Sequence, residues 1–399
     1  MNKIIIEKIL QKKVGNKTKL SFDLKINKKS FTLWYEIGCE DYDFSDGIEN
    51  RIDAVVATFL IFAMKKGYDF YSEYPISERL YYNLTYHVIP QLNVCNPTKT
   101  KKISIFAPLC KANGKKKYNF VATGVSCGVD SLATIYEYSE LCELEDYKLT
   151  HLVYFKTGAH DGQIGRFDKK VENDLFNGQV KKAVDFSQKA GFPLVVIDSN
   201  LNEVLSEAFG FTNYDMTHTF RSVGVMLLLQ DYFSLYYYAD AYNLDRFSIN
   251  VDEDTAHYDK WLLPMLSNEN IRMYSANKDM VRFDKTKLLT EYSLSYDNLL
   301  VCWTDEENCG KCNKCIRTLV TLDLLGKLDL YNKSFNLEDY YKNKDAYISK
   351  VIRLRKEDFL FDEIVQRMEV SKFKLFKCDL RHFFGKVLGK VRGLFIKNG

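Results

Sequence analysis

The sequence lacks the segments that would place a chain in or across a membrane. No uninterrupted apolar stretch reaches the roughly 18 residues that a transmembrane helix needs. The first residues, MNKIIIEKILQKK, combine too short an apolar run with too many charges for a signal peptide. We therefore expect a cytoplasmic protein.

A strong net charge and two common nucleotide-binding motifs are missing as well. The formal net charge is only +3, so the chain has no basic field that would indicate nucleic acid as a partner. It contains neither a GxxxxGK(S/T) loop nor a GxGxxG fingerprint. With 46% hydrophobic and 27% charged residues, the 399-residue chain nevertheless has the composition of a folded protein with two or three domains.

One stretch that is present, YNFVATGVSCGVDSLATIYEY over residues 118–138, organises the rest of the interpretation. An apolar strand at 120–123 leads into a turn of small residues at 126–131, and a helical pattern follows over 131–142. A strand, a tight turn and a helix in this order bind phosphate, because several backbone N–H groups and the positive end of the helix point at one spot. An ordinary strand–helix turn is the alternative.

The residue types in this turn suit an anion. Gly128 allows the backbone to come close to a ligand. The hydroxyls of Ser126 and Ser131 can donate hydrogen bonds, and Asp130 can hold Mg²⁺ against the anion.

From residue 118 onward, short apolar strands alternate with helical patterns. We predict strands at 120–123, 151–155, 194–198, 235–241 and 247–250. We predict helices between them at 131–142, 172–189 and 217–232. This alternation indicates an α/β fold, a doubly wound parallel sheet with helices on both faces. Ligands bind such sheets outside the carboxyl ends of the strands, which makes Thr157, Gly158, His160, Ser199 and Asn200 further candidates.

Two other parts of the chain complete the predicted organisation. Residues 1–117 form an N-terminal α+β module, with a hairpin of strands at 20–26 and 30–35 and with helices at 48–66 and 77–94, the second broken by Pro90. The domain with the parallel sheet then spans 118–335, and residues 336–399 form a helical tail.

The end of that tail is basic and amphipathic. Residues 371–399 carry eight Lys or Arg against one Asp, with apolar residues on one helical stripe. Peripheral contact with an anionic membrane and docking on the protein's own core are both open.

An acidic segment follows the fourth strand. Residues 252–259 contain four acids in eight positions. A solvated loop is the favoured interpretation, because buried acids without partners are costly. The alternative is a substrate pocket for an amine, an amide or Mg²⁺.

The strongest pattern is a run of cysteines, among the ten in the chain. Cys302, Cys309, Cys312 and Cys315 have the spacing C-x6-C-x2-C-x2-C. Four thiolates so close together in a reducing compartment indicate a tetrahedral Zn²⁺ site without an open position, hence a structural one. A [4Fe–4S] cluster is the alternative.

The turn SCGVDS at 126–131 resembles the SGGxDS loop of the PP-loop ATP pyrophosphatases. With the cysteine run about 170 residues further on, residues 118–325 are similar to the 7-cyano-7-deazaguanine synthases of that superfamily. Five features depart from the family, including an extra C-terminal tail and the absence of the purine-recognition pattern expected after the fourth strand. Cys127 replaces a glycine and tolerates positive φ poorly, the first cysteine spacing is six rather than eight, and the N-terminal module is extra.

The resemblance implies a HUP-like fold of the adenine-nucleotide alpha hydrolase type, with ATP, Mg²⁺ and Zn²⁺ as cofactors. It implies catalytic roles for Asp130 and for Arg221, which would contact a ligand phosphate. It implies that Thr157 and Gly158 shape the adenosine pocket. The expected ATP-binding residues are Ser126, Cys127, Gly128, Val129, Asp130, Ser131, Thr157, Gly158 and Arg221.

The implied reaction cleaves ATP to AMP and pyrophosphate and activates a carboxylate or amide for attack by a nitrogen nucleophile. A small-molecule acceptor is expected. No glutaminase segment is evident, so ammonia would be free or come from a partner. A homodimer is compatible with the sequence.

Three other functions stay open at this point. Sulfur transfer of the tRNA-thiolase kind would use Cys127, whose pKa a helix N-terminus would lower. An amidotransferase would act on a sugar or a peptide. A nucleotide-binding regulatory module would release no pyrophosphate.

Overall fold

The computed structural model describes residues 2–44, 48, 50–111, 118–159, 169–210, 213–302 and 307–368. The chain forms two compact units, Met1–Asp279 (unit 1) and Met280–Gly399 (unit 2). These limits differ from the boundaries at 117 and 335 that the sequence predicts. The difference arises because the N-terminal strands and the later parallel strands belong to the same sheet.

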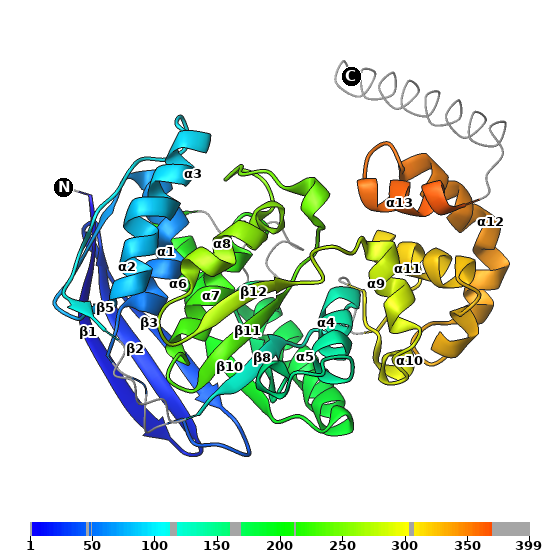
Figure 1. Ribbon diagram of the computed structural model, residues 1–399, viewed down its shortest axis with the longest axis horizontal. Helices are drawn as coiled ribbons and strands as arrows, with labels where there is room; N and C mark the ends of the chain where they lie inside the picture. Colours follow the sequence, from blue (N-terminus) through cyan, green and yellow to red (C-terminus); the bar gives the residue numbers. More distant parts are fainter. Residues whose placement is uncertain are drawn as a thin grey trace. The chain divides into compact units, whose positions relative to one another are not determined.

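Unit 1 is an α/β structure built on a ten-stranded, mostly parallel sheet in the order β12-β11-β8-β9-β10-β3-β2-β1-β4-β6 (Figure 1). A second, two-stranded sheet pairs β5 with β7. The strands are β1 (Lys3–Val14), β2 (Lys17–Ile26), β3 (Lys29–Gly38), β4 (Asp69–Ser72), β5 (Ile76–Ser77), β6 (Ile105–Phe106), β7 (Leu109–Cys110), β8 (Phe120–Gly124), β9 (His151–Phe155), β10 (Leu194–Ser199), β11 (Phe233–Ala239) and β12 (Arg272–Ala276).

The parallel half of the sheet contains β8 to β12. Their order in space, counted along the chain, is third, second, first, fourth, fifth, so the order reverses between β8 and β11. A crevice at the carboxyl ends of these two strands is the usual ligand site of such sheets. Figure 1 shows α4 and α5 on one face of this half and α7 and α8 on the other. The helices are α4 (Val129–Ser139), α5 (Lys169–Ala190), α6 (Leu201–Phe209), α7 (His218–Leu228) and α8 (Asp259–Leu266).

Four of the five predicted parallel strands are confirmed. The fifth, at 247–250, is wrong, because these residues are unpaired and follow a 3-10 helix at Leu244–Arg246. The fifth strand is β12 instead. Arg272 and Tyr274 of this strand are exposed, so the sequence has no continuous apolar run there that would predict a buried strand.

The antiparallel half contains β1, β2 and β3. The predicted hairpin is confirmed, with Leu20 opposite Tyr35 in the register of β2 and β3. Strand β1 escaped prediction because its alternation shifts at a bulge between Ile6 and Lys8. Strand β3 pairs antiparallel with β10, which joins the two halves.

Helix α1 (Asp53–Lys66) is buried almost throughout and packs on α7. The predicted break at Pro90 is wrong, because α2 (Glu78–Asn83) continues through a π turn at Leu84–Val88 into α3 (Ile89–Cys95). Pro90 lies just after the π turn, in which the N–H of Ile89 donates to the carbonyl of Leu84, and such a local widening of the helix accommodates the proline.

Unit 2 is helical and encloses its own core. Buried tyrosines, including Tyr331 and Tyr340, pack with aliphatic residues of the helices. Its helices are α9 (Arg282–Leu289), α10 (Leu294–Asn298), α11 (Asn313–Leu324), α12 (Leu337–Leu354) and α13 (Phe359–Arg367). Within the described ranges, no helix is long and apolar enough to cross a membrane. The basic segment 371–399 lies outside the described residues.

Candidate functional site

The turn at 126–131 connects β8 to α4 at the point where the sheet order reverses. The Ser131 hydroxyl fixes its shape, because it donates to the carbonyl of Gly124 (2.9 Å) and accepts from the N–H of Ser126 (3.1 Å). Gly128 is the N-cap of α4, and no side chain caps the helix there. Asp130, in the first turn of α4, is half-buried. The turn therefore presents a helix start without a side-chain cap, the kind of site that accepts anions.

Cys127 adopts the left-handed conformation, with φ of 56°. Its backbone thus takes the shape that a glycine would take most easily, at a cost of about 1–2 kcal/mol. The side chain is 4% exposed, and burial raises the pKa of its thiol to about 12. The predicted lowering of this pKa is wrong, because desolvation outweighs the helix N-terminus.

Thr157 and Gly158 follow β9 and are held by Arg221 of α7. One guanidinium nitrogen of Arg221, Nη1, donates to the carbonyl of Thr157 (2.9 Å) and to Oδ1 of Asn202 (3.0 Å). The Nε of Arg221 donates to the hydroxyl of Thr217 (2.8 Å). Gly158 has φ of +94°, and an added Cβ would lie 2.5 Å from Nη1 of Arg221. Thr157, Gly158 and Arg221, which the sequence analysis expects at one ligand site, therefore lie next to one another.

The side chain of Arg221 is fully buried. Its guanidinium carbon lies 5.9 Å from the ring centre of Phe62 and 5.6 Å from that of Tyr214. Arg221 therefore holds the loop after β9 in place through its hydrogen bond to the Thr157 carbonyl. Its direct contact with a ligand phosphate stays a prediction.

The other candidates at strand ends have structural partners. Ser199 donates to the carbonyl of Lys156 (2.5 Å). Asn200 accepts from the N–H of Trp34 (2.8 Å) and donates to the carbonyl of Thr32 (2.9 Å), which ties the loop after β10 to β3. His160 lies outside the described residues.

The acidic segment 252–259 divides into solvated and enclosed members. Asp252 forms surface ion pairs with Lys65 and Lys99, both at 3.0 Å, as the prediction of a solvated loop requires. Asp259 is fully buried and accepts from the hydroxyl of Thr219 (2.9 Å). Asp254 turns inward to His218 (2.8 Å). Solvation is therefore the wrong interpretation for Asp254 and Asp259, whose partners come from distant parts of the chain.

These inward-facing acids belong to a polar cluster at the carboxyl end of β11. We call it the β11 cluster, and its members are His218, Tyr238, Asp254, Thr255 and Asp259. Burial opposes the charged form of His218, but the hydrogen bond to Asp254 and the charges of nearby acids together outweigh burial and raise the pKa of His218. Burial opposes the charged form of Asp254 too, yet the hydrogen bond and charge of His218, with the hydrogen bonds from Ala256 and Tyr242, together lower the pKa of Asp254. The pair is thus held as an ion pair over part of the pH range.

Asp259 has the opposite electrostatics. Burial, with Asp240 close by, raises the pKa of Asp259 to about 8. Its Oδ2 has no hydrogen-bond partner among the described residues. Tyr238 escaped prediction as a site residue because it lies inside an apolar strand. Its only signal is the run of three tyrosines, 236–238, at the strand end.

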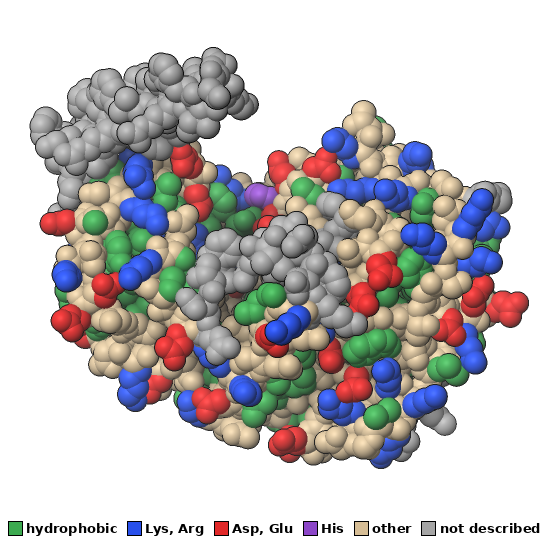
Figure 2. Space-filling model, turned by 180° about the vertical axis from the view of Figure 1, so that it is seen from behind, with side chains coloured by type: hydrophobic (Ala, Val, Ile, Leu, Met, Phe, Trp, Pro, Cys, Tyr) green, Lys and Arg blue, Asp and Glu red, His purple; other side chains and the backbone are tan. Residues whose placement is uncertain are grey.

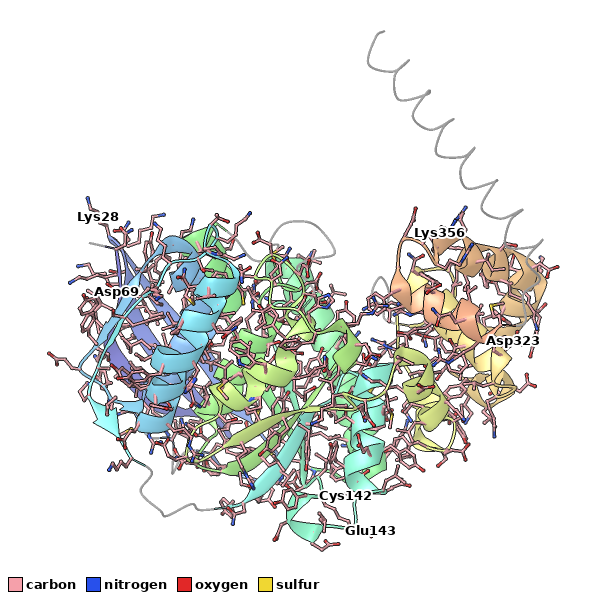
Figure 3. All side chains as sticks on the ribbon, turned by 45° about the horizontal axis from the view of Figure 1, so that its top comes forward. Lys28, Asp69, Cys142, Glu143, Asp323 and Lys356 are labelled. Atoms are coloured by element: carbon pink, nitrogen blue, oxygen red, sulfur yellow. The ribbon has the colours of Figure 1, made fainter. Side chains whose placement is uncertain are left out.

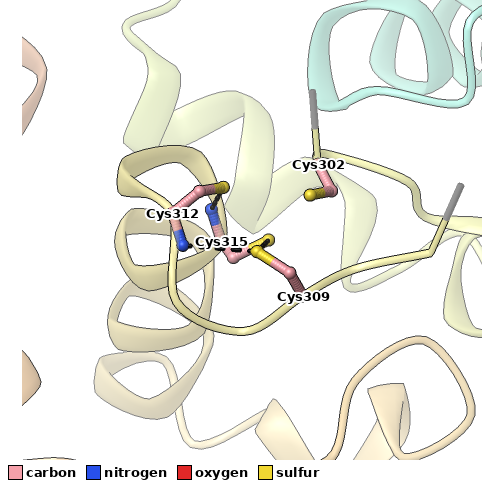
Figure 4. Close-up of side chains that lie close together, drawn as sticks. All are labelled: Cys302, Cys309, Cys312 and Cys315. Atoms are coloured by element: carbon pink, nitrogen blue, oxygen red, sulfur yellow. Dashed lines mark hydrogen bonds between the residues drawn. The ribbon is translucent and has the colours of Figure 1, made fainter. Parts of the chain in front are cut away.

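The four cysteines of the predicted metal site meet in unit 2 (Figure 4). Their sulfur atoms all lie within 4.8 Å of one another. Four bonds of about 2.3 Å to a tetrahedral zinc would place the sulfurs about 3.8 Å apart, so the group can hold such a metal ion or an iron–sulfur cluster. The N–H of Cys312 points to Sγ of Cys309 and the N–H of Cys315 to Sγ of Cys312, each at 3.4 Å. Such bonds stabilise thiolates.

Asn308 supports the cysteine group and was not predicted from the sequence. Its Oδ1 accepts from the N–H groups of Val301 (2.8 Å) and Cys302 (3.1 Å). Its Nδ2 donates to the carbonyls of Leu299 (2.7 Å) and Ser334 (2.9 Å). Asn308 therefore fixes the segment that carries Cys302. An asparagine beside a ligand cysteine was the only signal.

The other cysteines within the described residues are not part of this group. Cys142, labelled in Figure 3, follows the C-terminal end of α4, so it lies at the opposite end of that helix from Cys127. On the face shown in Figure 2, lysine and arginine side chains are interspersed with aspartate and glutamate. This distribution agrees with the small net charge.

Comparison of the chain with protein-family models, with curated proteins and with solved structures gave no match.

Proposed function

We propose that unit 1 binds ATP at the 126–131 turn and cleaves it to AMP and pyrophosphate, activating a carboxylate or amide for attack by a nitrogen nucleophile. One observation carries the proposal. The turn, with a helix start that no side chain caps, lies where the order of the parallel strands reverses. This is where parallel sheets bind phosphate-containing ligands.

The residues of the chain have distinct roles in this reaction. The backbone N–H groups at the start of α4 stabilise the charge of the leaving pyrophosphate. Arg221 holds Thr157 and Gly158 in place through its hydrogen bond to the Thr157 carbonyl, which orients the nucleotide. Asp130 would hold Mg²⁺, which neutralises phosphate charge when bound.

Nitrogen transfer is favoured over sulfur transfer by the state of Cys127. A sulfur carrier must be an accessible thiolate. The thiol of Cys127 is buried, and its pKa is raised to about 12. Cys127 then contributes its left-handed backbone conformation to the turn, and its thiol takes no part in the reaction.

For unit 2 we propose structural zinc at Cys302, Cys309, Cys312 and Cys315. Four protein sulfurs complete a tetrahedral site and leave no position for a substrate. Metal analysis of the purified protein, with the visible spectrum, distinguishes colourless zinc from a brown iron–sulfur cluster.

The test of the ATP chemistry uses the full chain with ATP, Mg²⁺ and a deproteinised cell extract as the source of acceptor. We expect AMP, pyrophosphate and an adenylated small molecule, identified by mass spectrometry. Asp130→Asn should reduce pyrophosphate release at least tenfold, while Glu140→Gln at the other end of α4 should not. ADP and phosphate would contradict the proposal, and nucleotide binding without pyrophosphate would indicate a regulatory module. An adenylated sugar or peptide would assign the acceptor class.

A further inference from the structure

Three side chains from three segments of unit 1 form a continuous hydrogen-bonded line. His218 is the first residue of α7, Tyr238 lies near the end of β11, and Asp254 precedes a 3-10 helix at Thr255–His257. Nδ1 of His218 lies 2.5 Å from the Tyr238 hydroxyl, and Nε2 lies 2.8 Å from Oδ1 of Asp254. The rings of His218 and Tyr238 are nearly parallel, at 9°. The line therefore runs from carboxylate to imidazole to phenol.

The surroundings fix the direction of this line. Asp254 accepts from the N–H of Ala256 (2.9 Å) and from the hydroxyl of Tyr242 (3.3 Å), so its carboxylate is held in place. In the neutral imidazole, Nε2 then donates to Asp254, and Nδ1 is left to accept from Tyr238. This is the arrangement in which a carboxylate orients a base and the base activates a hydroxyl.

The line lies at the carboxyl end of β11, the strand next to β8, which leads into the 126–131 turn. In the register of β11 and β8, Tyr237 is paired with Thr123. Tyr238 is therefore level with Gly124, the last residue of β8. The side chains of His218 and Asp254 remain 12% and 26% exposed, so the line reaches solvent at the carboxyl end of the sheet.

We propose that Asp254, His218 and Tyr238 form a proton relay that deprotonates the nitrogen nucleophile, and this inference rests on the proposed function. The nucleophile's lone pair forms the bond to the acyl carbon. One proton passes from the nitrogen to the Tyr238 oxygen while the phenol proton passes to Nδ1 of His218. The bond between the acyl carbon and the phosphate oxygen breaks, and AMP leaves with its electron pair. The imidazolium formed is paired with Asp254.

The groups that face His218 set its basicity. Asp215 precedes α7, Asp254 contacts the ring, and Asp259 of α8 lies behind Thr219. The ring of Tyr214 lies 5.6 Å away, and Tyr238 completes the enclosure. Lys260, also on α8, pairs with Asp240 at 3.0 Å. Burial lowers the pKa of His218, but the hydrogen bond and charge of Asp254, with smaller contributions from the other acids, outweigh burial and raise that pKa, which makes His218 a stronger base.

The test compares Tyr238→Phe and His218→Gln with wild type in the assay containing ATP, Mg²⁺ and extract. With ammonium chloride as the nitrogen source, we expect both variants to release one equivalent of pyrophosphate and then to turn over about a hundredfold more slowly. Hydroxylamine, which is largely unprotonated at neutral pH and needs no base, should restore turnover. His257→Gln, in the same loop with its ring bonded to the Arg246 carbonyl, is the matched control and should behave as wild type.

A second measurement tests the relay even if Tyr238→Phe or His218→Gln does not fold. Asp254→Asn should lower the pKa of His218 in ¹⁵N NMR of the histidine-labelled full chain, and it should move the rising limb of the pH–rate profile to lower pH by the same amount. Wild-type turnover in Tyr238→Phe, or a His218 pKa that Asp254→Asn leaves unchanged, would overturn the relay alone. Absence of pyrophosphate release in wild type would overturn the proposed function and the relay with it.

Discussion

The candidate ATP site and the cysteine group are built in opposite ways. The four cysteines lie within fourteen residues of sequence, and local N–H groups and one asparagine organise them. The residues around the 126–131 turn come from β8, β9, α7, β11 and the segment after it, and only the sheet brings them together. Substitution of one cysteine ligand can therefore abolish the metal site, whereas a site assembled by a sheet is stabilised by many interactions that each contribute little. The predictions below test that contrast.

Loss of the metal should have the largest effect. We expect Cys309→Ser to abolish metal binding and to destabilise unit 2 by more than about 5 kcal/mol, since structural zinc sites are worth about 10–16 kcal/mol. Metal analysis and thermal unfolding followed by circular dichroism measure this. Cys142→Ser, outside the group, is the control, and an unchanged metal content in Cys309→Ser would refute the site.

In unit 1 a large effect of a single substitution should come from Gly158→Ala. The added Cβ would meet Nη1 of Arg221 at 2.5 Å and Oδ1 of Asn202 at 2.7 Å, with φ at +94°. Strain and overpacking together should cost about 2–5 kcal/mol in urea denaturation. Gly191→Ala has a similar φ of +74° and open space around its Cβ. It should cost only about 1 kcal/mol, and equal effects would show that Arg221 does not support the loop.

Asn308→Ala should cost about 2–3 kcal/mol, because two N–H groups and two carbonyls lose their partner. Zinc affinity measured by competition with a chelator should fall as well, since Cys302 is no longer held. Asn298→Ala removes the hydrogen bond from Nδ2 of Asn298 to the Leu294 carbonyl, outside the cysteine group, and serves as the control. Unchanged zinc affinity in Asn308→Ala would mean that the cysteines organise themselves.

The amount of structure that the sequence predicts follows this same contrast. The cysteine group, the 126–131 turn, the β2–β3 hairpin and four parallel strands depend on neighbours in sequence, and each was predicted. What failed depends on distant partners. Asp254 and Asp259 read as solvated acids because their partners, His218 and Thr219, lie more than thirty residues earlier.

Burial also decides outcomes that local chemistry cannot. The helix N-terminus at Cys127 predicts an acidic thiol, yet its enclosure raises the pKa. Arg221 has the residue type of a phosphate ligand, but the sequence does not show that its side chain is wholly buried. The pairing of β3 with β10 joins residues that no local pattern connects.

Asp259→Asn should stabilise unit 1 at neutral pH. The pKa of Asp259 is about 8 in the folded protein against 3.8 for the free side chain, so between these values the folded state holds a proton that the unfolded state has lost. Stability of the wild type therefore falls as pH rises through this window. We expect the gain from Asn to grow from pH 4 to pH 8 and to exceed about 1 kcal/mol at pH 7. Asp252→Asn on the surface should show no such gain, and a pH-independent effect of Asp259→Asn would contradict the assignment.

Cys127→Gly should have the smallest effect. Glycine relieves about 1 kcal/mol of backbone strain at φ 56°, and it loses a similar amount through the buried thiol and chain entropy. Stability should change by less than about 1 kcal/mol and pyrophosphate release should persist. Loss of all turnover would instead make Cys127 a reactive residue and revive sulfur transfer.

The pairing of β3 with β10 has a consequence for synthesis of the protein. On the ribosome, the β1–β3 meander emerges long before β10, whose residues from Val196 to Ser199 pair with Gly38 to Tyr35. During that interval one side of β3 is an open sheet edge, a template for pairing with other chains. Newly made chains should therefore be most prone to aggregation and most dependent on chaperones after the meander has formed and before residue 199 has been added.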